Sequence, residues 1–349
     1  MIGLGRRSRA ARGGRRRALR RCAVLIGIAI GIALGIEIAV SYSHKALAVP
    51  WASEGSFAAE WRDLPTKCKR RLAFALPGRE DDAWAVTRAR SAAYVDMRAI
   101  RGIEAFDSKA RATQGLRVEE MFSQGVDGKI VPNLLRLNIP VRAIVIPFPV
   151  GVVSEMLHRG TVKQLRRFGF REDVDVYLQN PEMFHFSVFH ASHHLDEHAV
   201  SEAEFDEEVR SVRDGVTNHF CPIKAVLERV SVTAGGAVVA GWNVEKSSAG
   251  DPRDLRAQLR RALPNAPAKQ LVSNVNILHT TLARLIKPPK GVTDDARLAR
   301  ELSRELSDEF CGLELTLDRA WFVSEHHKLA LALRGAVDKV DLPFDCIAN

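Results

Sequence analysis

Several residue patterns that would point to a particular class of protein are missing from this chain of 349 residues. Its five cysteines include no Cys-x-x-Cys pair, which argues against a zinc cluster. No His-Glu-x-x-His segment is present, so the helix-borne zinc site of metalloproteases is excluded. Asn-x-Ser/Thr sequons are absent, so glycosylation gives no information about location, and no segment repeats at the periods of solenoid proteins.

Net charge is also scarce outside the first 21 residues. The formal net charge is +9, and residues 1–21 hold nine arginines and no acidic residue. The remaining 42 lysines and arginines are balanced by 42 aspartates and glutamates. A neutral body argues against extended nucleic-acid binding, which uses many phosphate contacts. It is compatible with a small phosphorylated substrate.

One long apolar run follows the arginine-rich tail. Residues 22–40 are uncharged except for Glu37, close to the ~20 residues that cross a hydrocarbon core. Because basic flanks stay in the cytosol, we predict a cytosolic tail over 1–21 and a transmembrane signal anchor over 22–40. The chain would be a single-pass type II membrane protein of the ER or Golgi with a lumenal catalytic domain. A cleaved signal peptide, with Ala46-Leu47-Ala48 at the cleavage site, and an organelle transit segment are the alternatives.

Two features bear on the assembly of such a protein. Gly27, Gly31 and Gly35 form a doubled GxxxG pattern, through which two anchors could pack as a homodimer. Four cysteines follow the anchor, an even number that permits two disulfides, with the pairing left open. These are Cys68, Cys221, Cys311 and Cys346.

Hydrophobic periodicity divides the rest of the chain into a stem and an α+β domain. We predict a stem with helical stretches over 41–135 and a domain over 136–349, with lobes at about 136–250 and 251–349. Helix-period and strand-period segments alternate in both lobes, so each should combine an antiparallel sheet with helices. The expected strands are 141–147, 174–178, 183–189, 227–233, 237–244, 276–285, 313–323 and 329–334. The expected helices are 152–168, 201–216, 252–263 and 293–310.

Two tetrapeptides on expected strands carry the chemistry. They are His185-Phe186-Ser187-Val188 and His279-Thr280-Thr281-Leu282. Side chains on a strand alternate between its faces, so each segment presents a histidine and a hydroxyl on one face and buries apolar groups on the other. Two such strands side by side would bring His185, Ser187, His279 and Thr281 to one space.

That set of groups suits a phosphodiester. A neutral histidine can take a proton from water or a ribose hydroxyl, and a protonated one can give a proton to the leaving oxygen. The hydroxyls can donate hydrogen bonds to the non-bridging oxygens as charge builds there. No metal is required for these steps.

The paired segments resemble the His-x-[Ser/Thr]-x signatures of the 2H phosphoesterase superfamily, which includes the so-called 2′-5′ RNA ligases and the cyclic phosphodiesterases. The resemblance covers about residues 136–349 and implies a bilobal fold with a pseudo-twofold axis, each lobe giving one motif strand to a central cleft. It implies metal-independent action, without a cofactor, on a small 2′,3′-cyclic nucleotide or an RNA-end phosphodiester. Matched by position, His185 and His279 would be the acid–base pair, and Ser187 and Thr281 would bind the substrate phosphate. The stem and anchor have no counterpart in the usual small soluble members.

A metal site is the first alternative. Five histidines and two acids lie within 14 residues, and His194 and His198 have the i, i+4 spacing of two ligands on one helix face. The competing interpretation is a solvated, histidine-rich loop. The residues are His185, His190, His193, His194, Asp196, Glu197 and His198.

A membrane-anchored lumenal glycosyltransferase is the second alternative. Asp173-Val174-Asp175 offers two carboxylates that could hold Mn²⁺ and a nucleotide diphosphate, or simply a solvated start of a strand. A non-catalytic nucleotide-binding module is the third.

No catalytic role is assigned to Arg284 or to residues 325–328. Arg284 is predicted to face away from His279 on its strand, and 325–328 are predicted to form a polar turn.

Overall fold

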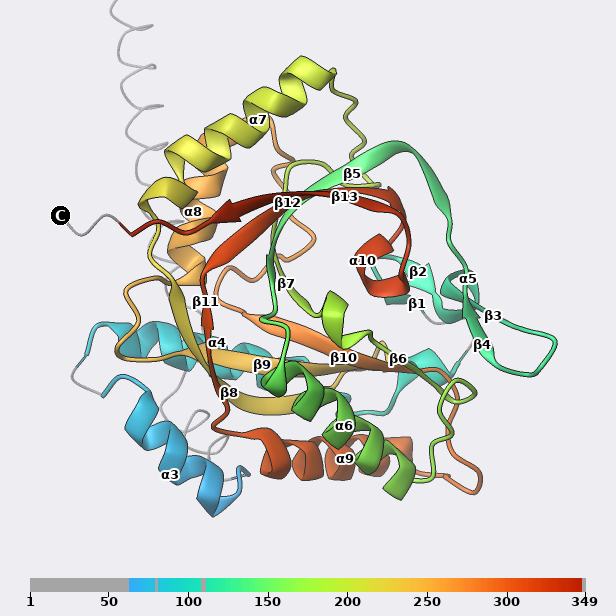
Figure 1. Cartoon of the computed structure of the whole chain (residues 1–349). Coiled ribbons are helices and arrows are strands. Elements are labelled where there is room, and N and C mark those ends of the chain that lie inside the picture. The colour runs from blue at the N-terminus through green and yellow to red at the C-terminus, as the bar shows by residue number, and fades with distance from the viewer. Residues whose placement is uncertain (1–62, 79–80, 108–110, 347–349) are drawn as a thin grey trace, which may run out of the picture. The chain divides into compact units, whose positions relative to one another are not determined.

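The computed structural model describes residues 63–78, 81–107 and 111–346, and these form part of one compact unit, 54–349 (Figure 1). The expected basic tail 1–21, the expected anchor 22–40 with its glycines, and the expected start of the stem lie outside the described residues. Within the described ranges, no helix is both long and apolar enough to cross a membrane.

Nine strands of the described residues form one antiparallel sheet in the order β11-β8-β9-β10-β7-β5-β12-β13, with β6 also paired to β10. The sheet curls, so that β8, β9 and β10 lie opposite β5, β12 and β13, with β7 between them (Figure 1). The strands are β5 Arg136–Pro147, β6 Val176–Leu178, β7 His185–His190, β8 Ile223–Val232, β9 Ala237–Val244, β10 His279–Leu285, β11 Glu314–Leu317, β12 Arg319–His327 and β13 Val337–Pro343.

The sheet has two halves that meet at a single residue pair. Strands β7 and β10 are joined only through Phe186 and Thr280, whereas every other neighbouring pair in the sheet shares three or more pairs. One half holds β7, β5, β12 and β13, and the other holds β10, β9, β8, β11 and β6. The two histidine strands therefore lie at the junction.

These halves are interleaved along the chain. The β8–β9 hairpin belongs with β10, while β12 and β13 return to β5. The expected division near residue 250 consequently does not separate the halves, because 136–250 and 251–349 each contribute strands to both. Periodicity identifies strands but does not say which strands pair, and long crossovers are invisible to it.

Helices cover the apolar face of both halves. The helices α6 (Val152–Arg167) and α9 (Asp295–Phe310) pack below β8–β10, and α7 (Glu202–Gly215) and α8 (Pro252–Ala262) pack together, with α8 against β7 (Figure 1). The buried stripe of α9 has the i, i+4 spacing of a helix face. Each of these helices matches an expected one, and α8 begins at Asp251-Pro252 with the Asp251 side chain as the cap.

The region expected to be a stem is in part built into this unit. Helix α3 (Thr66–Ala75) packs on β8, and α4 (Ala83–Asp96) packs on β8 and β9. Disulfides join Cys68 to Cys311 and Cys221 to Cys346. A 3₁₀ turn at Glu104–Phe106 and two small sheets complete the region, formed by β1 Arg111–Thr113 with β2 Leu116–Arg117 and by β3 Phe122–Gln124 with β4 Ile130–Pro132, with α5 Val118–Met121 between them.

The last expected hairpin, 313–323 with 329–334, is wrong. Residues 330–333 form the short helix α10 (Ala330–Leu333), which packs on β12, and β12 pairs with β13 instead. Strand β11 pairs with β8 at the other edge of the sheet. Short apolar runs do not distinguish a strand from a buried helical turn.

Candidate active site

The four residues predicted from the paired tetrapeptides line one cavity of about 500 Å³. His185 and Ser187 lie on β7, and His279 and Thr281 on β10. The alternation expected of the two strands is present: these four side chains are partly exposed, while Phe186, Val188, Thr280 and Leu282 are buried. The cavity is therefore the space that the sequence predicted.

The strand register sets which groups are neighbours. Phe186 and Thr280 form the residue pair that joins β7 to β10, and His185, Ser187, His279 and Thr281 are their sequence neighbours. All four line the same cavity, so two imidazoles and two hydroxyls share the space beside this pair.

Backbone contact fixes the tautomer of His185. Its Nδ1 lies 2.9 Å from the carbonyl oxygen of Met183, an acceptor, so Nδ1 carries the proton and Nε2 is left for the cavity. Burial lowers the pKa of His185, and Lys339 lowers it further, while the Met183 carbonyl opposes both by stabilising the charged ring.

Burial lowers the pKa of His279 to about 4, and three cationic or ionisable neighbours act in the same direction. In order of effect they are Arg256, His185 and Arg284. The ring of His279 is therefore neutral at pH 7 in the free protein, as a general base must be. A bound phosphodiester anion would favour the charged form of either ring.

A bulge changes the prediction for Arg284. The register on β9 shifts between Thr281 and Ala283, which are opposite Val239 and Val238, so one residue of β10 is skipped. The expected orientation of Arg284, away from His279, is therefore wrong: the bulge turns Arg284 to the same face, and it lines the cavity. Strict alternation could not show this, because a bulge reverses the parity of every residue after it.

Arg284 is a buried cation at this cavity. Its side chain is 8% exposed, and Nη1 has no hydrogen-bond partner among the described residues. Burial lowers the pKa of Arg284 to about 10, which still leaves it charged at neutral pH. A buried guanidinium with unused donors suits an anionic oxygen.

Strand β7 also contains a bulge. Its register on β5 shifts after Ser187, and His190 then faces the cavity. The two strands therefore share one pattern: a histidine, a hydroxyl two positions later, a bulge, and a nitrogen-bearing side chain five positions after the histidine. Those last side chains are His190 and Arg284.

Arg256 of α8 ties the two histidine strands together. Its Nε donates to the Val188 carbonyl at 3.0 Å, and Nη2 donates to the Ser187 carbonyl at 3.3 Å. In the segment that leads into β10 it reaches the Ile277 carbonyl at 2.9 Å and the Val275 carbonyl at 2.7 Å. These four bonds span the junction where the β7–β10 ladder has only one pair. The sequence offered one signal: Arg256 interrupts the apolar stripe of its helix.

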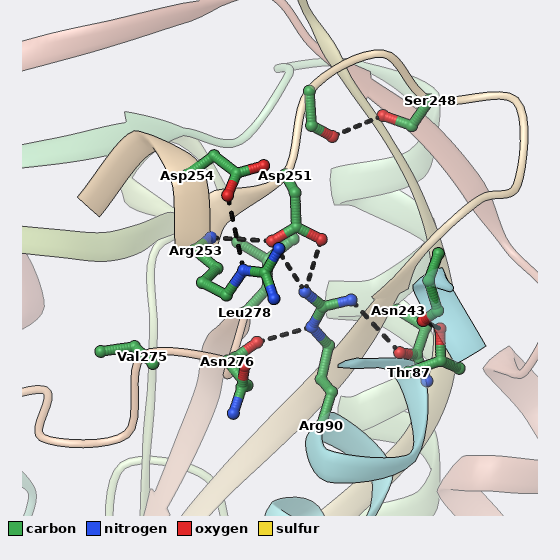
Figure 2. Close-up of polar contacts among 12 residues, drawn as sticks. Thr87, Arg90, Asn243, Ser248, Asp251, Arg253, Asp254, Val275, Asn276 and Leu278 are labelled. Atoms are coloured by element: carbon green, nitrogen blue, oxygen red, sulfur yellow. Dashed lines mark hydrogen bonds and ion pairs between the residues drawn. The ribbon is translucent and has the colours of Figure 1, made fainter. Parts of the chain in front are cut away.

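Helix α4 also holds the segment that leads into β10. Figure 2 shows the Arg90 guanidinium between Asp251 and the carbonyl of Asn276, three residues before His279; its ion pair with Asp251 is 2.9 Å long. The Tyr94 hydroxyl lies 2.9 Å from the Leu278 amide nitrogen. Residues of α4 and the loop 271–274 also line the cavity, a contribution that motif spacing could not reveal.

The remaining candidate residues are placed elsewhere. Asp175 is buried and held by Arg171, whose Nη2 is 2.7 Å from a carboxylate oxygen, so the Asp-x-Asp pair is not an open metal site. No group of three or more potential metal-ligating side chains occurs among the described residues, the histidine-rich segment included. Residues 325–327 end β12 instead of forming a turn.

No protein-family model matches the sequence, and no curated protein matches it. Distantly similar solved structures include TT0787 of Thermus thermophilus, with a TM-score of 0.41 and 14% identity over 60% of this chain and 100% of that one. A conserved protein of unknown function from Agrobacterium tumefaciens, ATU0111, has a TM-score of 0.43 and 11% identity, covering 59% and 86%. Kluyveromyces marxianus Usb1 has a TM-score of 0.36 and 10% identity, covering 58% and 97%. These similarities are too distant to indicate the role of any residue, so the site is interpreted from its geometry alone.

Proposed function

We propose that the chain is a metal-independent phosphodiesterase of the 2H phosphoesterase type. Its substrate would be a 2′,3′-cyclic phosphate or a phosphodiester at an RNA end. The observation that carries the proposal is the convergence of His185, Ser187, His279 and Thr281 on one cavity across a single β7–β10 pair. Arg284, a cation on the same face, supports a substrate with negative charge.

The surroundings of the two rings favour one assignment of roles. His279 is the base, because Arg256 and Arg284 disfavour its charged form. His185 is assigned as the acid, because its hydrogen bond to the Met183 carbonyl partly offsets the lowering of its pKa by burial and leaves Nε2 to donate. In hydrolysis, His279 takes a proton from water while the water oxygen bonds to phosphorus. The bond from phosphorus to the ribose oxygen breaks, and His185 gives that oxygen a proton.

The two hydroxyls and Arg284 stabilise the negative charge that builds on the non-bridging phosphate oxygens in the transition state. Ser187 and Thr281 line the same cavity as the two histidines and can donate hydrogen bonds to non-bridging oxygens. Arg284 adds a charged donor on the same face. None of these steps uses a metal or a cofactor.

The proposal extends to location. We propose membrane anchoring through residues 22–40, a lumenal catalytic unit and anchor pairing through Gly27, Gly31 and Gly35. The two disulfides support an oxidising compartment, where such bonds persist.

The test uses the full chain purified in detergent. We expect it to open a 2′,3′-cyclic nucleotide in the presence of EDTA. His185→Ala and His279→Ala should each lower kcat by roughly 10²–10⁴-fold, the usual contribution of an acid–base group. His326→Ala is the matched control, because His326 is exposed and pairs with Asp338 on β13 instead of lining the cavity.

Three results would overturn the proposal: loss of activity in EDTA, full activity in both histidine variants, or nucleotide binding with no turnover. The first would return attention to metal-dependent transfer, and the third to a binding module. Folding of each variant is checked by circular dichroism.

A further inference from the structure

A second cavity, of about 720 Å³, lies apart from the histidine cavity and has no lining residue in common with it. Its wall is formed by the residues that lead into α3, the segment 98–100 after α4, the edge of β8 and one face of α9. Five arginines and two acids line it, although the chain after residue 21 is neutral in sum. We call it the arginine cavity, after Arg98, Arg229, Arg297, Arg300 and Arg304.

The arginine cavity lies where one edge of β8 has no neighbouring strand. Strand β11 pairs with β8 only over 223–226, and past this point the edge meets no further strand of the described residues. Two hydroxyls of α9 take the place of a strand. Ser307 accepts from the Val230 amide and Ser303 from the Val232 amide, each at 2.9 Å. Because serine side chains are short, they satisfy the strand edge and still leave space beside it.

Three of the arginines form a row on α9. Arg297, Arg300 and Arg304 have the i, i+3, i+7 spacing that places side chains on one face of a helix. The first and last lie roughly 10 Å apart along the helix axis, because a helix rises 1.5 Å per residue. One phosphate group cannot contact a row of this length, whereas a molecule with several phosphate groups can.

The acids beside this row leave its guanidinium groups accessible to a ligand. Arg297 pairs with Glu301 at 2.8 Å and Arg304 with Glu305 at 3.4 Å, and both arginine side chains are largely exposed. Exposed ion pairs contribute little to stability, so a multiply charged anion can compete for such groups. Arg300 lines the cavity and has no ion pair within the described ranges.

The other two arginines approach the space from different elements. Arg229 extends from β8 with a side chain only 4% exposed, and it is held 2.6 Å from Glu228, which does not line the cavity. Arg98 follows α4, and its Nη1 lies 3.8 Å from a carboxylate oxygen of Asp63. The cations therefore come from three separate elements, which distinguishes this site from the solvated face of a single helix.

We propose that the arginine cavity binds a small molecule that carries several phosphate groups. Guanidinium groups match phosphate oxygens with two parallel hydrogen bonds, and the volume is that of an ordinary ligand site. Leu64, Pro65 and Ile100 add apolar contacts for the scaffold that carries the phosphates. Two sources offer this chemistry: a soluble polyphosphorylated molecule and the phosphorylated headgroup of a membrane lipid. The site does not depend on the phosphodiesterase proposal, because neither histidine takes part in it.

The test measures thermal unfolding of the full chain in detergent, with inositol hexakisphosphate as the probe. We expect Tm to rise by about 3–8 °C at a saturating concentration, because a ligand that binds only the folded state stabilises it. Arg300→Glu and Arg304→Glu should each weaken the apparent affinity by about tenfold or more. Both residues are exposed, and the Tm of each variant without the probe reports whether it is folded.

Arg210→Glu is the matched control. It makes the same change of charge at an exposed arginine of α7 that pairs with Glu207 and does not line the cavity. Its affinity for the probe should stay within about twofold of the wild type. The nine arginines of residues 1–21 are present in every variant, so the comparison cancels any contribution from them.

Two further probes define the ligand and its source. Inorganic phosphate at the same total phosphate concentration should raise Tm less, and an equal rise would overturn the claim that several phosphate groups bind together. Micelles with phosphatidylinositol 4,5-bisphosphate are compared with micelles that contain phosphatidylcholine. A rise with the phosphorylated lipid supports a headgroup as the source, and a rise with inositol hexakisphosphate alone supports a soluble ligand. No rise with either, or an equal rise in Arg300→Glu and the wild type, would overturn the inference.

Discussion

Arg256 bridges β7, which carries His185, and the segment that leads into β10, which carries His279. Four carbonyls converge on its guanidinium, two from β7 and two from the segment that leads into β10, at a point where backbone pairing is nearly absent. Burial lowers its pKa to about 10, so it remains charged and adds to the field at His279. Arg256 therefore affects both the position of the two histidine strands and the pKa of His279, and substitutions can separate the two effects.

We predict that Arg256→Gln lowers kcat by at least tenfold and the free energy of unfolding by about 2–4 kcal/mol, because buried carbonyls lose charged donors. It should also move the acid limb of the kcat/KM profile to higher pH. The sign follows from His279: removing a cation raises a lowered pKa, so the ring becomes a neutral base only at higher pH.

Arg256→Lys is the partner variant. Lysine keeps the positive charge but cannot bond all four carbonyls as the guanidinium does. We therefore expect kcat to fall while the acid limb of the kcat/KM profile stays near its wild-type position. Stopped-flow pH profiles and urea unfolding provide both readouts. An unchanged limb in Arg256→Gln would show that Arg256 does not contribute to the lowered pKa of His279.

Among the elements, β9 and α4 set one wall of the site through a close contact at Gly241. Gly241 is opposite His279 on β9, and a Cβ there would come 2.8 Å from the Tyr94 ring. Tyr94 is also the residue whose hydroxyl meets the Leu278 and Trp242 backbones. The glycine therefore lets α4 approach β9 at the position opposite His279.

We predict that Gly241→Ala lowers the free energy of unfolding by about 1–3 kcal/mol and lowers activity, because an overpacked contact must displace α4. Gly215→Ala is the control: no atom lies within 4 Å of its added Cβ, and its helix should gain up to ~1 kcal/mol. Thermal and urea unfolding of both variants measure the difference. Equal stabilities would mean that α4 shifts without cost.

The same elements show what the sequence could predict. Alternation found His185 and His279 because the histidine and the hydroxyl of each tetrapeptide precede the bulge, where strand parity still holds. It misplaced Arg284 and left His190 in a loop, because a bulge has no signature in a strand's apolar pattern. The helices of 152–168 and 252–263 were predictable from periodicity and caps. Their partners were not, because pairing depends on contacts between distant residues.

At the scale of the molecule, two disulfides join distant parts of the described unit. Cys68–Cys311 spans 243 residues and fixes α3 to the end of α9, and Cys221–Cys346 spans 125 residues. Loops of this length make each bond worth about 2–5 kcal/mol through the entropy of the unfolded chain. The even number of cysteines after residue 40 permitted two bonds, but the sequence alone left three possible pairings.

We predict that Cys68→Ser and Cys221→Ser each lower the urea midpoint, and that dithiothreitol lowers the wild-type midpoint further than either variant. Reduction removes both bonds, whereas each substitution removes one. The two variants should retain activity in the absence of denaturant, because no disulfide cysteine lines the cavity. A midpoint unaffected by reductant would show that the bonds are not formed in the purified protein.

The interleaved sheet has a consequence for biosynthesis. A chain grows from its N-terminus, and residues 319–343, which complete the half of the sheet around His185, are made after β7, β8, β9 and β10. The α10 wall of the cavity is made in the same late stretch. A nascent chain that has not yet reached residue 319 therefore has both histidines but lacks β12, β13 and the α10 wall, so the cavity cannot form until the residues up to 343 have been made.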